Sequence, residues 1–349
     1  MNNPTDRPLS THLDVENPQN LSAYQSTGGY QGFSNALKIS PHEVQQQVTD
    51  SNLKGRGGAG FSTGMKWSFV PMGENAPEHK YLVCNADEME PGTFKDRWLM
   101  EGAPHLLIEG MLIAAYAIGA DVAYIFLRGE YRLCATRLHQ AIEEAYAAGW
   151  LGENIKGTPY TLKLHLHTSA GRYICGEETA LINALEGKRL PSILKHGSHW
   201  YTQLTAGTDS GSKIYGISGK VKNAGLWELP MGTPAREIFQ LAGGMQDGLT
   251  LRGWLPGGAS TDFLMPEHLD LPMEYDAIAK AGSRMGTGLI IALDDQHCPV
   301  GMILNLLQFF AQESCGWCTP CRDGLPWAVE ILTRIESGHG NQDDMDTLQ

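Results

Sequence analysis

Apolar residues along this chain recur at two spacings, and the order of those spacings predicts a layered α/β fold. Short apolar runs over 81–84 and 122–127 predict buried strands, and alternating apolar and polar residues over 162–167 predict a half-buried strand. Apolar residues at helical spacing predict helices over 104–118, 133–148 and 177–185. Strands that alternate with helices are typical of a mostly parallel sheet.

The pattern changes after about residue 205, where shorter periods predict a small α+β module. Its expected strands cover 213–221, 225–229 and 249–254, with a helix over 234–241. Helical spacing then returns over 300–310 and 326–335.

Both ends of the chain are polar, so residues 1–40 are expected to be loop-like and 337–349 to fray. A helix is expected to begin at Pro41, because Ser40 can cap it and Glu43 supplies an acid in its first turn. Together these patterns predict an N-terminal extension and three domains, over 1–40, 41–204, 205–292 and 293–349.

The chain has 349 residues and a net charge of -13, which is enough length for two or three domains. The acidic balance argues against non-specific binding to nucleic acid. The N-terminus has no apolar leader, and the most apolar stretch, 106–127, contains Glu109 and Asp121, so we expect a buried helix and strand rather than a membrane span. Seven cysteines without a leader fit a reducing compartment, so a soluble cytoplasmic protein is expected.

Three of the cysteines, Cys315, Cys318 and Cys321, form a C-x-x-C-x-x-C motif. Thiolates at this spacing can converge on one face of an iron–sulfur cluster, which predicts one-electron chemistry. A zinc-binding module is the alternative, but no second cysteine pair or spaced histidines follow to complete four ligands. A 4Fe–4S cluster also takes four ligands, and no cysteine follows Cys321. The scattered cysteines are expected to be small buried apolar residues: Cys84, Cys134, Cys175 and Cys298.

A glycine-rich loop covers 55–64, with the basic residues Arg56 and Lys66 in it or beside it. Glycines let a backbone approach a ligand closely and point N–H groups at it, and the two cations suit a phosphate. The loop is not a P-loop, because no Gly-Lys-Ser/Thr follows, and not a dinucleotide fingerprint, because no clear strand precedes it. The alternative is a flexible surface loop.

Three acids, Asp87, Glu88 and Glu90, follow the strand expected at 81–84. Ligands in α/β proteins lie at the carboxyl ends of strands, so these side chains are expected at a site. Carboxylates accept hydrogen bonds from ribose hydroxyls and repel a 2′-phosphate. The alternative is a solvated acidic turn.

A third motif, from Gly171 to Ala180, lies between the strand expected at 162–167 and a helix. Taken alone, its acids Glu177 and Glu178 are better explained as helix caps than as site residues, because acids in a first turn favour the helix dipole.

The four motifs read K-G-R-G-G-A-G-F, C-N-A-D-E-M-E-P-G-T, G-R-Y-I-C-G-E-E-T-A and E-S-C-G-W-C-T-P-C-R in chain order. With them, the chain from about Tyr24 to Leu348 closely resembles the NADH-binding flavoprotein subunit of bacterial respiratory complex I. It also resembles the related diaphorase subunits of NAD-linked hydrogenases and formate dehydrogenases. The resemblance implies a Rossmann-like FMN/NADH domain, then a ubiquitin-like (SLBB-type) domain, then a helical iron–sulfur domain.

The resemblance implies NADH as substrate, and FMN and a 4Fe–4S cluster as cofactors, the cluster being held by the three cysteines of the motif. Glu90 and Glu178 would lie near the nicotinamide and its ribose, and Phe61 and Phe69 would stack on the adenine. Hydride transfer of this kind depends on stacked rings more than on a side-chain base. The FMN site would be formed by Gly55, Arg56, Gly57, Gly58, Ala59, Gly60, Phe61, Ser62, Thr63, Gly64, Lys66, Asn85, Asp87, Glu88, Tyr173, Gly176 and Glu177.

Compared with the family pattern, roughly three dozen residues are missing between Arg189 and Leu190. The family's fourth cysteine and most of a helical bundle are missing after the cysteine motif. The internal loss would remove part of the flavin site, and losing several hydrogen-bond donors at about 1 kcal/mol each would weaken FMN binding by orders of magnitude. We therefore expect a chain of this family that is impaired or inactive alone.

Two other functions fit the same residues: a non-catalytic remnant that serves in assembly, and a diaphorase subunit of a hydrogenase or formate dehydrogenase. The resemblance implies two partners, a thioredoxin-like 2Fe–2S subunit and a large multi-cluster iron–sulfur subunit. It also implies a peripheral position on the cytoplasmic face of the inner membrane, held through complex I without direct contact with lipid.

Overall fold

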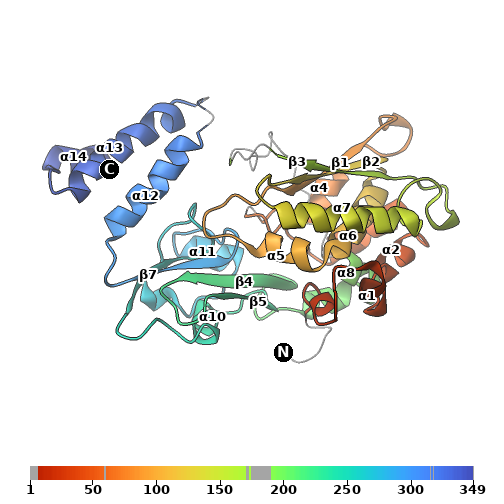
Figure 1. Cartoon of the computed structure of the whole chain (residues 1–349), viewed down its shortest axis with the longest axis horizontal. Coiled ribbons are helices and arrows are strands. Elements are labelled where there is room, and N and C mark those ends of the chain that lie inside the picture. The colour runs from red at the N-terminus through yellow and green to blue at the C-terminus, as the bar shows by residue number, and fades with distance from the viewer. Residues whose placement is uncertain are drawn as a thin grey trace.

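The structure is a computed structural model that describes residues 7–58, 60–169, 173, 190–314, 316 and 318–348. Figure 1 shows its parts: an α/β part, a second sheet beside it, and a helical hairpin that extends from the second sheet. Within this described part of the chain, no helix is both long and apolar enough to cross a bilayer.

The first sheet is parallel, as the sequence predicts. Its strands pair in chain order: β1 (Tyr81–Ala86), β2 (Val122–Leu127) and β3 (Lys163–Thr168). The helices that follow β1 and β2 confirm the predicted ones: α6 (Pro104–Ile118) and α7 (Arg132–Ala147). The helix predicted over 177–185 lies outside the described residues.

Helix α6 is apolar on every side, and all of its residues except Tyr116 are buried. Pro104 opens the helix, where a missing N–H costs nothing, and Gly119 ends it with a φ of 67°. A helix without a polar face must be covered all round. The sheet covers one side of α6, and helices from the N-terminal part of the chain cover the other.

The prediction that residues 1–40 are loop-like is wrong. They include α1 (Leu21–Ser26) and α2 (Gln31–Ala36), which pack on α6. Glu109, a buried acid of α6, accepts hydrogen bonds from the Tyr24 hydroxyl (2.5 Å) and from the N–H groups of Tyr30 (2.6 Å) and Phe33 (2.9 Å). A buried carboxylate without such donors is costly, so the N-terminal segment folds onto this one.

The second sheet is mixed and, among the described residues, has four strands in the order β5-β4-β7-β6. Strands β4 and β7 pair in parallel, and the other pairings are antiparallel. The predicted helix and strands are confirmed, whereas β7 and α11 are not predicted. The bounds are β4 (Ser212–Gly219), β5 (Gly225–Pro230), β6 (Leu251–Leu255), β7 (Leu289–Asp294), α10 (Ala235–Leu241) and α11 (Tyr275–Lys280).

The α/β part also contains shorter helices: α3 (Pro41–Asp50) and α4 (Thr63–Ser68) before β1, α5 (Lys95–Gly102) after β1, and α8 (Leu190–His196) and α9 (Ser198–Gln203) between the two sheets along the chain. Helix α3 confirms the predicted start, because Ser40 and Glu43 form a capping box. The others are one or two turns long, which is too short for hydrophobic spacing to predict.

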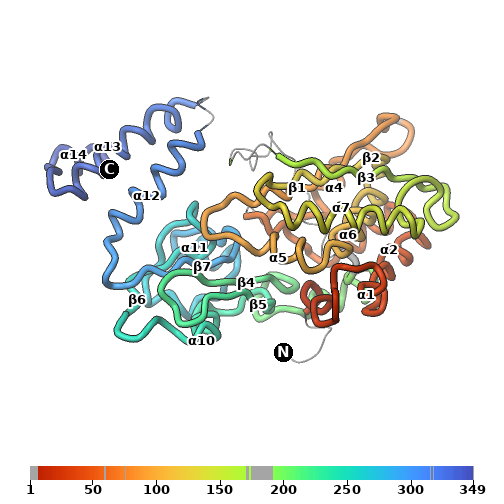
Figure 2. The backbone as a smooth tube through the Cα atoms, in the orientation of Figure 1, coloured from red at the N-terminus to blue at the C-terminus, as the bar shows by residue number. Residues whose placement is uncertain are grey.

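The C-terminal part contains α12 (Pro299–Gln312), α13 (Leu325–Glu336) and α14 (Gln342–Leu348). Helices α12 and α13 confirm the predicted pair and pack into the hairpin that Figure 2 traces. The expected fraying of 337–349 is wrong. Asn341 caps α14 by accepting from the Asp344 N–H (3.0 Å), and the Asp344 carboxylate pairs with Arg334 of α13.

A second buried carboxylate ties the N-terminal segment to the second sheet. Glu228 of β5 accepts hydrogen bonds from the N–H groups of Leu9 (3.0 Å) and Ser10 (2.7 Å) and from the Ser212 hydroxyl (2.6 Å). The N-terminal segment therefore bridges the two sheets, through Glu109 on one side and Glu228 on the other.

Replacing Glu228 with alanine is expected to lower the free energy of unfolding by about 3 kcal/mol, because several buried donors lose their acceptor. Urea denaturation of the wild type and variant measures the difference. Glu237 is an exposed acid of α10, so Glu237→Ala serves as the control and should change stability by less than about 0.5 kcal/mol. Equally small effects of both substitutions would contradict this role of Glu228.

Candidate functional site

The carboxyl ends of β1, β2 and β3 meet at one edge of the first sheet, and the acidic motif begins there. Asp87 follows β1 and is buried; its Oδ1 accepts from the Ser169 hydroxyl beyond β3 (3.0 Å), and its N–H donates to the Asn85 side chain (3.0 Å). Its Oδ2 is buried without a hydrogen-bond partner among the described residues. Burial raises the pKa of Asp87. A buried acceptor with a spare oxygen suits the hydroxyl of a ligand.

Glu88 forms hydrogen bonds within the protein. Its carboxylate accepts from the N–H groups of Asp96 (2.8 Å) and Arg97 (3.1 Å), at the start of α5, and from the Tyr131 hydroxyl (3.1 Å). Burial, and then the charge of Asp96, raise the pKa of Glu88 to about 7, against the opposing effect of Lys95. Glu88 therefore positions α5 behind the acidic turn.

The glycine-rich loop closes on itself and leaves its tip bare. The Gly55 N–H donates to the Phe61 carbonyl (2.8 Å), which joins the two ends of the loop. A Cβ on Gly57 or Gly58 would meet no atom within 4 Å, and Gly58 has a φ of 138° that favours glycine. The tip thus offers bare backbone beside open space.

The far end of the loop is built into the fold. Ser62 is the N-cap of α4, and Thr63 and Gly64 are buried. A Cβ on Gly64 would lie 2.3 Å from the Thr49 hydroxyl oxygen of α3. These contacts anchor the far end of the loop to α3 and α4.

Arg56 lies on the buried side of the loop. Its guanidinium donates to the Ser210 carbonyl (2.9 Å), in the segment before β4. Burial alone would lower its pKa, but the Tyr201 and Tyr275 hydroxyls raise the pKa overall, so the charge is retained. Arg56 is therefore placed to hold the loop against the second sheet.

Residues of the α+β module that contains the second sheet, here called the second module (205–292), also hold the loop in place. The Tyr275 hydroxyl donates to the Gly55 carbonyl (2.6 Å), and the Tyr275 ring occupies the space of a Cβ at Gly60, which would lie 2.6 Å from it. Lys54 pairs with Asp209 (2.6 Å), whose other oxygen accepts from the Tyr275 N–H (3.2 Å). The conformation of the loop thus depends on residues of the second module.

Three side chains near the loop remain available to a ligand. Phe61 and Phe69 expose 44% and 69% of their surfaces. Lys66, in α4, has no hydrogen bond or ion pair with any described residue. Exposed aromatic rings can stack on a base, and an unpaired ammonium can meet a phosphate.

Glu90 accepts hydrogen bonds on both carboxylate oxygens. One comes from the Tyr173 hydroxyl (2.7 Å), in the third motif, and the other from the Ser260 N–H (2.7 Å), in the second module. Burial, and then Glu90, raise the pKa of Tyr173, so its hydroxyl stays protonated as the donor. Glu90 thereby joins two of the predicted motifs.

Tyr173 also contacts the helical hairpin. Its N–H donates to the Glu313 carboxylate (3.1 Å), and its ring packs edge-on against Phe309 and Phe310 of α12, with centroids 5.4 and 5.6 Å away. Glu313 stands two residues before Cys315, so the second, third and fourth motifs meet around one tyrosine.

Cys318 is exposed and Cys321 is half-exposed, and both are free thiols. The Cys318 carbonyl accepts from the Cys321 N–H (3.1 Å), which puts the two residues in one turn. Among the described residues no three possible metal ligands converge, and Cys315 lies outside them. Two accessible thiols in one turn fit ligation of a single cluster.

The predictions for the scattered cysteines are partly confirmed. Cys84 and Cys134 are buried, as predicted. Cys298 is exposed, because it forms the N-cap of α12 at the surface, so that prediction is wrong. Predicted residues that lie outside the described ones are Ala59, Cys175, Gly176, Glu177, Glu178 and Cys315.

Several residues of the site have no assignment from the sequence. Tyr275, Asp209 and Ser260 lie 220, 155 and 170 positions from the residues they bind, and no local pattern marks them. Glu313 stands inside the cysteine motif, and its position two residues before Cys315 is the sequence signal that could have marked it as a site residue.

Three family models match the chain, in the predicted order. They are the Nuo51 FMN-binding domain over residues 48–203, the SLBB domain over 214–263, and the NADH-ubiquinone oxidoreductase-F iron-sulfur binding region over 301–349. The F subunit of NADH-quinone oxidoreductase from Escherichia coli (strain K12) is 53% identical over 379 aligned positions, which cover 99% of this chain and 85% of that protein. The chain belongs to this F-subunit family of NADH-quinone oxidoreductases. Family membership confirms the predicted fold class, the oxidoreductase class, and FMN and 4Fe–4S as the cofactors.

Another member and a solved structure agree with this assignment. The corresponding NADH-quinone oxidoreductase protein of Streptomyces coelicolor is 42% identical, and the match covers 97% of this chain and 82% of that protein. A crystal structure of an NAD+-reducing [NiFe]-hydrogenase in the H2-reduced state superposes with a TM-score of 0.82 at 32% identity. That match covers 98% of this chain, which spans 60% of the hydrogenase chain.

The alignment to the Escherichia coli relative is longer than the chain. Its 379 positions exceed the 349 residues here by 30, so at least 30 positions of that relative have no counterpart in this chain. The Streptomyces coelicolor alignment, with 370 positions, shows an excess as well. These two relatives therefore carry internal positions that this chain lacks, in agreement with the predicted internal loss.

Glu88→Gln is expected to change how stability depends on pH. A carboxyl group with a pKa of about 7 when folded and 4.5 ordinarily binds a proton more readily in the folded state, so its stabilising contribution is present below pH 4.5 and is lost as pH rises through about 7. Over this interval the wild type should lose roughly 3 kcal/mol more than the variant. Urea denaturation at several pH values measures this, with the exposed Glu237→Gln as control. Parallel pH curves for wild type and Glu88→Gln would show that Glu88 does not titrate in this way.

Proposed function

We propose that this chain is the NADH-oxidising flavoprotein subunit of an electron-transfer complex. Bound FMN and a bound 4Fe–4S cluster would supply the chemistry, hydride acceptance from NADH followed by one-electron transfer. The observation that carries the proposal is the position of Tyr173, which bonds both to Glu90 of the acidic turn and to Glu313 before the cysteine motif. The proposed flavin and cluster sites are thus neighbours, as a short electron path requires.

The described residues fit FMN. We assign its phosphate to the bare backbone at Gly57 and Gly58 and to the ammonium of Lys66, which has no partner among the described residues. The ribityl hydroxyls are assigned to Asp87, whose Oδ2 has no partner among the described residues. Arg56 is assigned a positioning role, because it lies under the loop and binds the second module. The remaining members of the site are assigned by family resemblance: Asn85, Tyr173, Gly176 and Glu177.

NADH is assigned to the outer side of the same edge. Phe61 and Phe69 are exposed and would stack on the adenine. Glu90, with Glu178, would face the nicotinamide ribose. Although both oxygens of Glu90 already accept a hydrogen bond, a carboxylate has about four acceptor positions, so one can still receive a ribose hydroxyl. These residues orient the rings and exclude water; none acts as an acid or base.

The cluster is assigned to Cys315, Cys318 and Cys321, and electrons would leave through the hairpin. None of the residues of α12, all of which are described, is buried, and Trp327 of α13 exposes 70% of its surface. We propose that this apolar surface docks on a thioredoxin-like 2Fe–2S subunit and a large multi-cluster subunit. That assembly would hold the chain at the cytoplasmic face of the inner membrane.

A diaphorase subunit of an NAD-linked hydrogenase is the second candidate. The likeness to the NAD+-reducing hydrogenase, at a TM-score of 0.82, supports it. The same FMN, NADH and cluster sites would then deliver electrons to or from a different protein. Purification of the chain with its natural partners distinguishes the two.

We also propose that this chain binds FMN weakly. We assign the missing family segment to the position after Arg189, beside Gly176 and Glu177 of the proposed FMN site. Losing two or three hydrogen bonds at about 1 kcal/mol each would weaken binding roughly 30- to 150-fold. A chain that had lost FMN binding altogether would be a non-catalytic remnant that serves in assembly.

The test is to co-express the chain with its partner subunits, reconstitute FMN and iron–sulfur, and measure FMN, iron and zinc per chain together with NADH–ferricyanide turnover. Turnover that appears only at high FMN concentration is the expected result. Full occupancy at low FMN would contradict weak binding, whereas a colourless complex without flavin or iron would leave only the assembly role.

Phe69→Ala is expected to raise the KM for NADH about tenfold and to leave FMN content unchanged, because loss of one base–aromatic stack costs on the order of 1–3 kcal/mol. Steady-state kinetics at saturating FMN measure it. Tyr81→Ala is the control, since Tyr81 is equally exposed (62%) but starts β1, at the opposite edge of the sheet. A KM unchanged by Phe69→Ala would remove Phe69 from the adenine site.

Tyr275→Phe is expected to weaken FMN binding about fivefold, because the Gly55 carbonyl loses its donor and the loop loosens. Fluorescence titration with FMN measures this. Tyr160→Phe is a matched control: it also removes a hydroxyl that donates to a backbone carbonyl, that of Ala120 (3.0 Å), at the amino end of β2. Equal FMN affinities in the two variants would show that Tyr275 does not hold the loop.

A further inference from the structure

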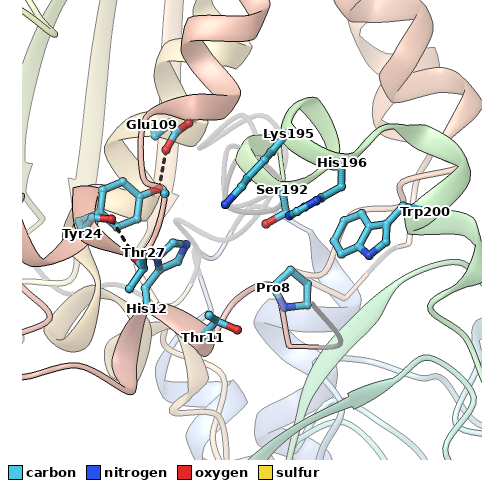
Figure 3. A pocket seen from close by; sticks show the side chains of 11 residues that line it. Pro8, Thr11, His12, Tyr24, Thr27, Glu109, Ser192, Lys195, His196 and Trp200 are labelled. Atoms are coloured by element: carbon cyan, nitrogen blue, oxygen red, sulfur yellow. Dashed lines mark hydrogen bonds between the residues drawn. The ribbon is translucent and has the colours of Figure 1, made fainter. Parts of the chain in front are cut away.

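A cavity of about 130 Å³ lies between the N-terminal segment and helices α8 and α9 (Figure 3). It has room for several water molecules or one small polyatomic anion. None of the residues that line it belongs to the proposed FMN, NADH or cluster sites. The cavity is therefore separate from the proposed flavin site.

Lys195, near the end of α8, extends its ammonium group into this cavity (Figure 3). Its Nζ lies over the backbone at Gly28, where a Cβ would be 2.3 Å away. Within the described part of the chain, Lys195 has no hydrogen bond or ion pair. A half-enclosed ammonium has lost part of its hydration, and no described residue supplies a counter-charge in return, so an anion beside it would be stabilised.

Ser192 and His196 lie on the same face of α8 as Lys195, because residues three and four apart on a helix are neighbours. Ser192 is buried, and Figure 3 shows its hydroxyl directed into the cavity. That hydroxyl has no hydrogen-bond partner among the described residues. A hydroxyl can donate to an anion, so α8 presents one cation and one donor to the same space.

His12 faces α8 from the N-terminal segment. Its Nδ1 lies 2.5 Å from the Thr27 hydroxyl oxygen, and the hydroxyl proton of Thr27 goes to the Tyr24 carbonyl (2.8 Å). Nδ1 is therefore the donor, and Nε2 is free to take a second proton. Burial, and then Lys195, lower the pKa of His12 to about 4. An anion beside Lys195 would offset the repulsion between Lys195 and His12, and so favour the protonated, cationic form of His12.

One acid, Glu109, also borders the cavity. It forms no ion pair with Lys195. Its oxygens accept from the Tyr24 hydroxyl and from the backbone N–H groups of Tyr30 and Phe33, and burial raises its pKa. Its charge is therefore either compensated by these donors or removed by a proton, which limits its repulsion of an anion.

We propose that this cavity binds a small oxyanion of sulfate or phosphate size, held by Lys195 and Ser192 and faced by His12. The bound anion would join the N-terminal segment to α8 and stabilise the fold. The site does not depend on the proposed function, because it shares no residue with the FMN, NADH or cluster sites.

The test is calorimetric titration of the full chain with sulfate at constant ionic strength. Wild type is expected to bind one sulfate, and Lys195→Gln at least about tenfold more weakly, since it removes the charged donor that α8 supplies. Ser192→Ala should weaken binding a few-fold and serves as a second reading should Lys195→Gln fold poorly. Lys38→Gln removes an exposed lysine that bonds only to Asn35 among the described residues, so it controls for net charge and should bind like wild type.

Lys66→Gln separates this cavity from the proposed FMN phosphate site. Sulfate binding that survives Lys66→Gln and fails in Lys195→Gln supports the proposal. Binding that fails in Lys66→Gln and survives in Lys195→Gln, or no binding by the wild type, would overturn it. Sulfate also stabilises proteins generally by exclusion from their surface, so a rise in melting temperature counts only where it is larger for wild type than for Lys195→Gln.

Discussion

A carboxylate buried in a protein must receive hydrogen bonds, and the arrangement of this chain follows from how its buried acids receive them. Glu109 of α6 accepts hydrogen bonds from α1 and α2 and so holds them against α6. Glu228 holds Leu9 and Ser10 against the second sheet in the same way, and Glu88 accepts from the first N–H groups of α5. In each case backbone N–H groups supply at least half of the donors. Helices and strands form from local patterns, but these acids decide which segments become neighbours.

The same constraint shapes the candidate site. Glu274 accepts from the N–H groups of Thr208 and Asp209, and Asp209 in turn pairs with Lys54 beside the glycine-rich loop. The loop is thereby set by the second module rather than by its own sequence. Asp87 is the exception, since its Oδ2 is buried and has no partner among the described residues. That difference separates an acid that supports the fold from one that is available to a ligand.

The contacts around Tyr173 hold three parts of the candidate site together, although this chain lacks internal positions of its relatives. Tyr173 binds Glu90 and Glu313, and Glu90 also accepts from the Ser260 N–H. The fold is likewise kept in a hydrogenase chain at 32% identity. These contacts therefore do not depend on the positions that this chain lacks.

The sequence by itself determined the parallel sheet and helices α6, α7, α12 and α13, because hydrophobic periodicity is a local property. The resemblance of its four motifs to a known family added the family and its cofactors. The tertiary structure decided that Tyr24, Tyr30 and Phe33 fold onto Glu109, that Arg56 lies under its loop, and that Tyr275 binds the Gly55 carbonyl 220 positions away. These contacts depend on which donor reaches a buried acceptor in three dimensions. The spacing of residues along the chain does not show which donor reaches which acceptor.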